Sequence, residues 1–342
     1  MKRKQILFTA PGVAEYVERD LSELAADEAL VRTEYSAISA GTEFANLMGT
    51  PNLPSGDKWP KACGYSSVGR IVAVGEKFKK FEVGDRVLVY HGQHANYNIA
   101  KASKMFAVPE KLDSKEAALV IIAAMGLGAV RKMDIEMGHS AMIIGLGLLG
   151  MFAMEFARAS GAYPVIVSDF NEKRRKLALE LGADYVLDPA DDDYTEQVKR
   201  ITNGKGVKNI VEVTGSARAL EQALKVIAPM GSIALNGCTR VSDMHIDYYS
   251  EVHRPGVKLI GAHNFVRPKV ESYPGHWTME DDCLCIMDMV VGGRIDIKTI
   301  ISEIHNPWEA PEVFSRLANG HYNFPLGVLF DWTDSEYNKE GG

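Results

Sequence analysis

The 342-residue chain has few cysteines and no long apolar run. Its cysteines form no CxxC pair, so we expect reduced thiols in a cytoplasmic protein rather than a disulfide framework; they are Cys63, Cys238, Cys283 and Cys285. The longest apolar stretch, residues 117–130, is too short to cross a bilayer. The basic N-terminus, MKRKQILF, is not followed by the apolar segment of a signal peptide.

The chain also lacks an excess of positive charge. Its net charge of -7 argues against a general affinity for nucleic acid or for anionic membranes. We therefore expect a small molecule as its partner. At roughly 150 residues per domain, the length suggests about two domains, each able to bury a core without disulfides.

The sequence has three regions that differ in their pattern of predicted secondary structure. Residues 1–118 alternate short β-rich runs with turn residues, which predicts a small barrel; examples are residues 29–33, 69–75 and 84–90. Residues 119–265 alternate strands with helices and predict a doubly wound parallel α/β sheet, with strands at residues 141–144, 164–168, 185–187, 209–213, 232–235 and 258–260. The remaining residues, 266–342, contain a helix at 279–292 and are too few for a third domain, so we expect them to complete the first.

A glycine-rich turn follows the first strand of the middle region. Gly145, Gly147 and Gly150 form a GxGxxG motif between an apolar strand and a helix. The first glycine permits a tight turn, the second lets the backbone approach a pyrophosphate, and the third lets helix and strand pack closely. We expect a dinucleotide to bind here, with its pyrophosphate at the start of the helix, near Leu148 and Leu149.

An acidic residue ends the next strand. Asp169 lies 169 − 145 = 24 residues after the first glycine of the motif. A carboxylate at this distance binds the adenosine ribose hydroxyls and repels a 2′-phosphate, so the sequence predicts NAD rather than NADP. Arg174, flanked by Lys173 and Arg175, is a candidate contact that favours a phosphate instead, unless these cations form only a solvated helix face.

Two small polar residues follow later strands of the same sheet. Thr214 comes after residues 209–213, and Asn236 comes after residues 232–235. Ligands bind beyond the carboxyl ends of such strands, so we expect both residues to line the cofactor cleft.

Together, several segments resemble the medium-chain dehydrogenase/reductase superfamily over nearly the whole chain. They are the glycine loop and residues 31–43, 64–75, 81–87 and 181–184. The resemblance implies a GroES-like β-barrel catalytic domain, made of residues 1–118 and 266–342, and a Rossmann NAD-binding domain, residues 119–265. It also implies an active site in the cleft between the two domains.

The zinc ligands of that superfamily are missing. Zinc-dependent members have a cysteine where this chain has Ala40, a histidine where it has Tyr65, and a third ligand close to Ile121. None of these three side chains is a usual zinc ligand. The lobe that holds a structural zinc is also absent, because only residues 90–98 separate the flanking strands. We therefore predict a zinc-independent member without a metal.

Four residues near the lost ligands are candidates for acid–base chemistry. Thr42 stands where relatives keep a proton-relay hydroxyl, and the Tyr65 phenol could point at the substrate oxygen. Glu43 could be a base or an anchor, and His94 is of a residue type that titrates in the range useful for proton transfer. Structural alternatives stand beside these roles: Thr42 as a helix cap, Tyr65 as a filler of the space left by zinc, Glu43 as an ion-pair partner, and His94 in a solvated turn with His91.

The region after the last Rossmann strand supplies candidates for substrate binding. His263 and Asn264 follow that strand directly, and the resemblance places them near the nicotinamide. Farther on, His276 and Trp277 combine a polar donor with an aromatic plate, which suits a polyhydroxylated ring. The alternative is that Trp277 only packs at the joint between domains.

These features favour hydride transfer between NAD(H) and a secondary alcohol or ketone of a sugar, polyol or cyclitol, without a metal. The alternatives are a zinc-free reductase of enones or quinones, a redox-neutral NAD-dependent epimerase or lyase, and a non-catalytic NAD-binding protein. The strand at residues 258–260 is expected to lie at a sheet edge, where pairing with a second copy would give a homodimer or homotetramer.

Overall fold

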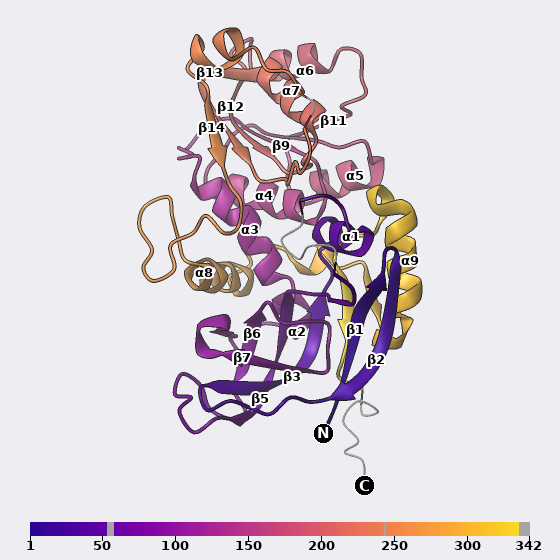
Figure 1. Cartoon of the computed structure of the whole chain (residues 1–342). Coiled ribbons are helices and arrows are strands. Elements are labelled where there is room, and N and C mark those ends of the chain that lie inside the picture. Colours follow the sequence, from indigo (N-terminus) through magenta and orange to yellow (C-terminus); the bar gives the residue numbers. More distant parts are fainter. Residues whose placement is uncertain (53–57, 243, 335–342) are drawn as a thin grey trace. The chain divides into compact units, whose positions relative to one another are not determined.

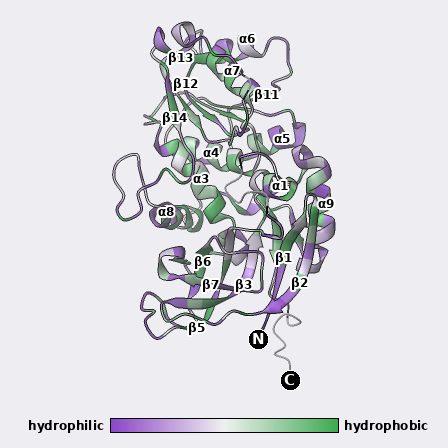
Figure 2. Cartoon of the chain, viewed as in Figure 1, coloured by the Kyte–Doolittle hydropathy of each residue, from purple (hydrophilic) through white to green (hydrophobic). Residues whose placement is uncertain are grey.

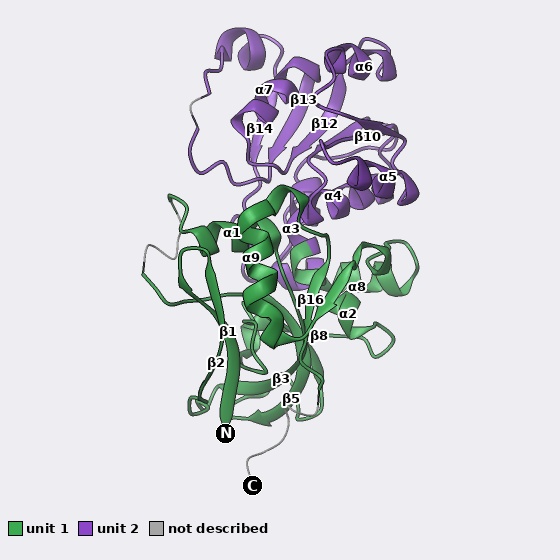
Figure 3. Cartoon of the chain, turned by 90° about the vertical axis from the view of Figure 1, so that its right-hand side faces the viewer, with its two compact units in different colours: residues 1–122, 283–342 green, residues 123–282 purple. Residues whose placement is uncertain are grey.

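The computed structural model describes residues 1–52, 58–242 and 244–334 of the chain (Figure 1). The chain divides into two compact units (Figure 3): unit 1 holds residues 1–122 and 283–342, and unit 2 holds residues 123–282. The first boundary lies four residues after the expected one at 118/119. The second lies 17 residues after the expected one at 265/266, so residues 266–282 belong to unit 2.

Unit 1 is built on two sheets. Seven strands form one sheet in the order β15-β16-β3-β5-β6-β8, with β7 paired to β3, and three form another in the order β2-β1-β4. The strands are β1 (Lys2–Ala10), β2 (Val13–Asp20), β3 (Glu28–Ala37), β4 (Lys61–Ala62), β5 (Ser66–Val74), β6 (Arg86–Tyr90), β7 (Tyr97–Lys101), β8 (Met105–Ala107), β15 (Glu303–His305) and β16 (Val328–Asp331).

The C-terminal segment from Cys283 onward belongs to unit 1. Strand β16 pairs antiparallel with the end of β3, through Leu329 opposite Ala37. The helices of this unit are α1 (Ala40–Met48), α2 (Ser114–Ala117) and α9 (Ala310–Gly320). Phe314 of α9 and Phe330 of β16 are fully buried in a core with Phe8 of β1, so residues far apart in the sequence share one hydrophobic cluster.

Unit 2 is a doubly wound parallel sheet, which confirms the expected Rossmann arrangement. Its strand order is β11-β10-β9-β12-β13-β14, and every neighbouring pair is parallel. The strands are β9 (Ala141–Ile144), β10 (Val165–Ser168), β11 (Tyr185–Leu187), β12 (Val207–Glu212), β13 (Ile227–Leu235) and β14 (Lys258–Gly261). β14 forms one edge of this sheet; its pairing with a second copy stays a prediction, which the native mass of the protein tests.

Helices α4 (Leu148–Ala159), α5 (Glu172–Glu180), α6 (Tyr194–Ile201) and α7 (Ala217–Val226) connect these strands. Strands β9 and β10 are buried along their whole length, whereas α5 is mostly hydrophilic (Figure 2). Buried parallel strands are apolar along their length, whereas an exposed helix carries many charges. An apolar run followed by a charged segment therefore predicts a strand followed by a helix.

Two helices pass from one unit to the other. α3 (Val120–Arg131) leaves unit 1 after Ile122, and α8 (Met279–Val291) returns to it at Cys283. No helix among the described residues has the length and apolar character needed to span a bilayer.

Candidate dinucleotide site and hydroxyl cluster

Each of the three glycines in the loop after β9 is needed for a different physical reason. Gly145 has φ +96°, and a Cβ there would lie 2.6 Å from the Thr214 methyl carbon. A Cβ on Gly150 would lie 1.9 Å from the Gly145 carbonyl oxygen. By contrast, a Cβ on Gly147 would have no atom within 4 Å. The first and third glycines are therefore needed by the fold, whereas the second leaves open space for a ligand.

That open space lies at the start of α4. Gly147 is the N-cap residue of this helix, and no side chain there caps the helix. The N–H groups of the first turn, which includes Leu148 and Leu149, have no partner within the helix and carry the positive end of its dipole. A pyrophosphate fits these donors, so the loop meets the chemical requirements of a dinucleotide site.

Asp169 lies beside this loop at the end of β10. Its carboxylate accepts hydrogen bonds from the backbone N–H of Leu146 at 2.6 Å and of Asn171 at 2.7 Å. Arg174 Nη1 lies 4.0 Å from the same carboxylate, and only 13% of the Asp169 side chain is exposed. Burial lowers the pKa of Arg174. Arg174 is thus largely covered rather than part of a solvated helix face, and a cation stands next to the predicted ribose contact.

Polar groups lie at the carboxyl ends of β12 and β13. Glu212 is buried at the end of β12, and its carboxylate accepts hydrogen bonds from the backbone N–H groups of Thr214 at 2.6 Å and Gly215 at 3.1 Å. Burial raises the pKa of Glu212. Asn236 donates through Nδ2 to the carbonyl oxygens of Met125 and Ala262, and its buried Oδ1 has no hydrogen-bond partner among the described residues. An acceptor without a donor at a strand end is a feature that a ligand N–H would satisfy.

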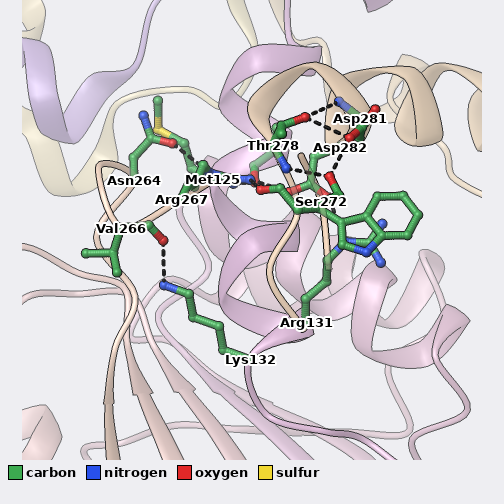
Figure 4. Close-up of polar contacts among 12 residues, drawn as sticks. Met125, Arg131, Lys132, Asn264, Val266, Arg267, Ser272, Thr278, Asp281 and Asp282 are labelled. Atoms are coloured by element: carbon green, nitrogen blue, oxygen red, sulfur yellow. Dashed lines mark hydrogen bonds and ion pairs between the residues drawn. The ribbon is translucent and has the colours of Figure 1, made fainter. Parts of the chain in front are cut away.

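The loop after β14 is fixed by an ion-pair network that Figure 4 shows. Asp282 is fully buried at the start of α8, and it binds Arg131 Nε at 2.6 Å and Arg267 Nη1. Arg267 also donates to the Ala124 carbonyl oxygen of α3. A Cβ on Gly128 would overlap the Arg267 guanidinium, so the glycine makes room for this contact.

The predicted substrate residues lie on this loop in different surroundings. The Arg131 guanidinium lies 3.5 Å from the centre of the Trp277 ring, so one face of the indole is covered. Asn264 accepts a hydrogen bond from Arg267 Nε at 3.1 Å. His263 is exposed, and His276 stacks on Tyr273 with ring centres 4.9 Å apart. Arg267 and Asp282 hold the loop that carries these residues. The sequence did not reveal this pair, because two opposite charges 15 residues apart form no local pattern.

Asp282→Asn is expected to lower the free energy of unfolding by about 3–5 kcal/mol, because two guanidinium groups lose the buried carboxylate between them. Asp281→Asn is the matched control. The Asp281 carboxylate accepts from the hydroxyls of Ser272 and Thr278, and an amide oxygen can still do so. Urea unfolding followed by circular dichroism measures both variants; equal losses of stability would contradict this account.

In unit 1, Tyr65 belongs to a cluster of hydroxyl groups. Its phenol is hydrogen-bonded to the side chains of Ser39 and Thr42, at the N-terminal end of α1. Burial raises the pKa of Tyr65 well above its usual range, and these two hydrogen bonds only partly oppose that effect. Thr42 lies in the first turn of α1, whose N-cap residue is Ser39. Ser39 is a member that the sequence did not reveal, because a lone serine has no distinctive pattern.

Glu43 and His94 form a buried pair that contacts this cluster through Ser39. His94 Nε2 lies 3.0 Å from a Glu43 carboxylate oxygen, and the other carboxylate oxygen accepts from the Ser39 backbone N–H at 3.1 Å. His94 Nδ1 lies 2.7 Å from Ser36 Oγ, which accepts from the Trp332 indole N–H at 2.9 Å. His94 is 0% exposed, so it does not lie in a solvated turn, whereas His91 is exposed.

Two places in unit 1 have to be compared with the usual ligands of zinc. At the positions where the resemblance expects ligands, Ala40 has no donor atom, Ile121 is buried in α3, and the Tyr65 hydroxyl is hydrogen-bonded. Those residues do not fit zinc. In the described part of the chain, three other potential metal ligands lie close together. One ligand atom from each of Glu43, Cys63 and His94 lies within 4.8 Å of the other two.

Comparisons with known proteins agree with this architecture. A family model described as a zinc-binding dehydrogenase matches residues 149–272, and one described as an alcohol dehydrogenase GroES-like domain matches residues 25–130. L-threonine 3-dehydrogenase of Thermococcus kodakarensis is 33% identical over 266 residues, which cover 69% of this chain and 75% of that protein. D-guloside 3-dehydrogenase of Escherichia coli is 25% identical over 354 residues, covering 96% of this chain and 100% of that protein.

Solved structures share the fold at lower identity. Galactitol-1-phosphate dehydrogenase from Escherichia coli superimposes with a TM-score of 0.82 at 18% identity, covering 96% of this chain and 99% of that one. A putative zinc-binding dehydrogenase from Sinorhizobium meliloti, bound to NADP, gives a TM-score of 0.82 at 22% identity, covering 97% and 99%.

The chain therefore belongs to the medium-chain dehydrogenase/reductase superfamily. It is an enzyme, an alcohol oxidoreductase of a family that uses nicotinamide cofactors. The expected GroES-like and Rossmann domains are confirmed.

Proposed function

We propose that this enzyme transfers a hydride between NAD(H) and a secondary alcohol or ketone of a sugar, polyol or cyclitol, with a hydroxyl group instead of a metal at the reacting oxygen. The observation that carries this proposal is the Tyr65 cluster. Where the family has zinc ligands, this chain has a phenol bonded to Ser39 and Thr42, and Ala40 has no donor. The named relatives that act on a guloside and on galactitol 1-phosphate support a polyhydroxylated substrate.

The elevated pKa of Tyr65 keeps its phenol protonated near neutral pH, so it acts as a hydrogen-bond donor to the substrate oxygen. When bound, the nicotinamide supplies the site that accepts or gives the hydride. In oxidation, Tyr65 accepts the alcohol proton as its own proton passes to Thr42 or Ser39. Thr42 is partly exposed and can pass that proton to solvent. Reduction follows the same path in reverse.

In this scheme Glu43 and His94 are anchors and not proton donors to the substrate. Both are buried, with 2% and 0% of their surface exposed. Glu43 accepts from the Ser39 backbone N–H, so the pair holds the residue that bonds to Tyr65.

We assign the cofactor-facing and substrate-facing roles in unit 2 as the sequence predicted them. Thr214, Asn236 and His263 would contact the cofactor. His263, Asn264 and His276, with the Trp277 ring, would meet substrate hydroxyls and C–H faces. A panel of polyols and keto-sugars, read as NADH absorbance, tests the proposal: turnover of at least one member supports it, and inactivity with the whole panel contradicts it.

The preference for NAD rests on the charge of Asp169. Asp169→Asn keeps an acceptor for the Leu146 N–H and removes the charge, so the ratio of kcat/KM for NADP to that for NAD is expected to rise about tenfold, or roughly 1.4 kcal/mol. Arg174→Ala in the same background should reverse part of the gain, because Arg174 Nη1 lies 4.0 Å from residue 169. Steady-state kinetics with both cofactors measures the ratio, and an unchanged ratio in Asp169→Asn would overturn this assignment.

A further inference from the structure

The cluster of Glu43, Cys63 and His94 combines a carboxylate, a thiol and an imidazole in the interior of unit 1. The three residues are 2%, 4% and 0% exposed, and their ligand atoms lie within 4.8 Å of one another. They come from separate segments: Glu43 from α1, Cys63 from the residue after β4, and His94 from the turn between β6 and β7. We propose that this cluster is a closed structural site for a divalent transition metal such as Zn²⁺, displaced from the family's ligand positions.

The charge of the cluster suits such an ion. On binding M²⁺, the thiol releases its proton to solvent, and the sulfur, the Glu43 carboxylate and the neutral imidazole each give an electron pair to the ion. The charges of one thiolate, one carboxylate and one divalent cation sum to zero, which removes most of the cost of burying each charge alone.

The surrounding contacts orient these ligands in the way that outer groups do at metal sites. Ser36 Oγ lies 2.7 Å from His94 Nδ1, which leaves Nε2 directed at the other two residues. The Ser39 backbone N–H donates to one Glu43 oxygen, and the two Glu43 oxygens lie 3.2 and 3.0 Å from His94 Nε2. A hydrogen bond to the far nitrogen of a histidine, and one to a carboxylate, are typical of ligands fixed for metal binding.

Steric detail supports the same geometry. Gly64 has φ +85°, and a Cβ there would lie 2.6 Å from the His94 backbone nitrogen and 3.0 Å from its ring. Any larger residue at position 64 would therefore push the His94 ring away from the segment that carries Cys63. Without a metal, the Cys63 thiol donates a hydrogen bond to the Ile6 carbonyl oxygen at 3.2 Å.

The donor set selects the kind of metal and its role. Mixed sulfur, nitrogen and oxygen donors suit Zn²⁺ and Co²⁺, and not Mg²⁺ or Ca²⁺. Because all three residues are buried, a substrate would have no access to an ion at this site. The ion would link three segments of unit 1 and leave the reaction to the Tyr65 hydroxyl cluster, so this inference does not rest on the proposed reaction.

The test measures metal content and not turnover. Protein produced with added Zn²⁺ should contain a stoichiometric amount by mass spectrometry, and after exchange with Co²⁺ it should show thiolate-to-cobalt charge-transfer absorption. Cys63→Ser should lose this absorption, and His94→Gln should lose the metal. Cys285→Ser and His91→Gln are the matched controls and should keep both signals.

A milder variant covers the case in which a ligand substitution prevents folding. Ser36→Ala leaves all three ligands and removes the group beside His94 Nδ1, so competition with a chromophoric chelator should show roughly 10–100-fold weaker binding. Folded wild-type protein that takes up neither Zn²⁺ nor Co²⁺, or a folded Cys63→Ser variant with unchanged cobalt absorption, would overturn the proposal. Neither result depends on substrate or NAD, so failure here is distinct from failure of the proposed reaction.

Discussion

Tyr65→Phe is expected to lower kcat about 10²–10³-fold, because in the proposed mechanism it removes the hydroxyl that donates to the substrate oxygen. The ring remains, so packing in unit 1 and the dissociation constant for NAD(H) should change little. Steady-state kinetics with an accepted polyol, together with fluorescence titration of NADH, separates the two effects.

Two further variants make this expectation specific. Tyr35→Phe removes a phenol that is hydrogen-bonded to Asp331 elsewhere in unit 1, and it should leave kcat unchanged. Thr42→Val should slow turnover because it breaks the hydrogen bond to Tyr65, whereas Thr42→Ser should restore most of the rate. A Tyr65→Phe enzyme with nearly the wild-type kcat would refute the hydroxyl mechanism, and a zinc-free enone or quinone reductase would then be the next hypothesis to test.

Gly147→Ala is expected to abolish measurable dinucleotide binding without unfolding the protein. A Cβ at this position meets no protein atom within 4 Å, but it would fill the space at the start of α4 that we expect a pyrophosphate to occupy. The melting temperature without cofactor should stay at the wild-type value, and addition of NADH should no longer raise it.

Gly150→Ala provides the contrast. Its Cβ would lie 1.9 Å from the Gly145 carbonyl oxygen, so the loop and α4 must move apart at a cost of about 3 kcal/mol. This variant should lose stability as well as NADH binding. If both alanine variants were equally stable, the separate roles assigned to the second and third glycines would be wrong.

The dinucleotide half of the enzyme was predictable from sequence because its signals are local. The expected strands at residues 141–144 and 185–187 coincide with β9 and β11, and the glycine loop lies where the motif places it. Parallel strands buried on both faces are continuous apolar runs, and a tight turn demands glycine, so both leave a direct mark on the sequence.

The chemistry of unit 1 was only partly predictable. In the sequence, Thr42, Glu43, Tyr65 and His94 form one group of candidates. The structure divides them, with Tyr65 bonded to Thr42 and Glu43 paired with His94. Which way each side chain points depends on three segments of unit 1 meeting in space, and no spacing rule in the sequence encodes that.

The sequence by itself determined the class of enzyme and the position of the glycine-rich loop after β9, because each depends on residue types at fixed local spacings. Tertiary structure decided which polar groups work together. Ser39 joined the Tyr65 cluster, Cys63 met Glu43 and His94, and these contacts exist because packing brings distant segments together. The energetic consequences of burial, such as the raised pKa of Tyr65, likewise arise only in the folded chain.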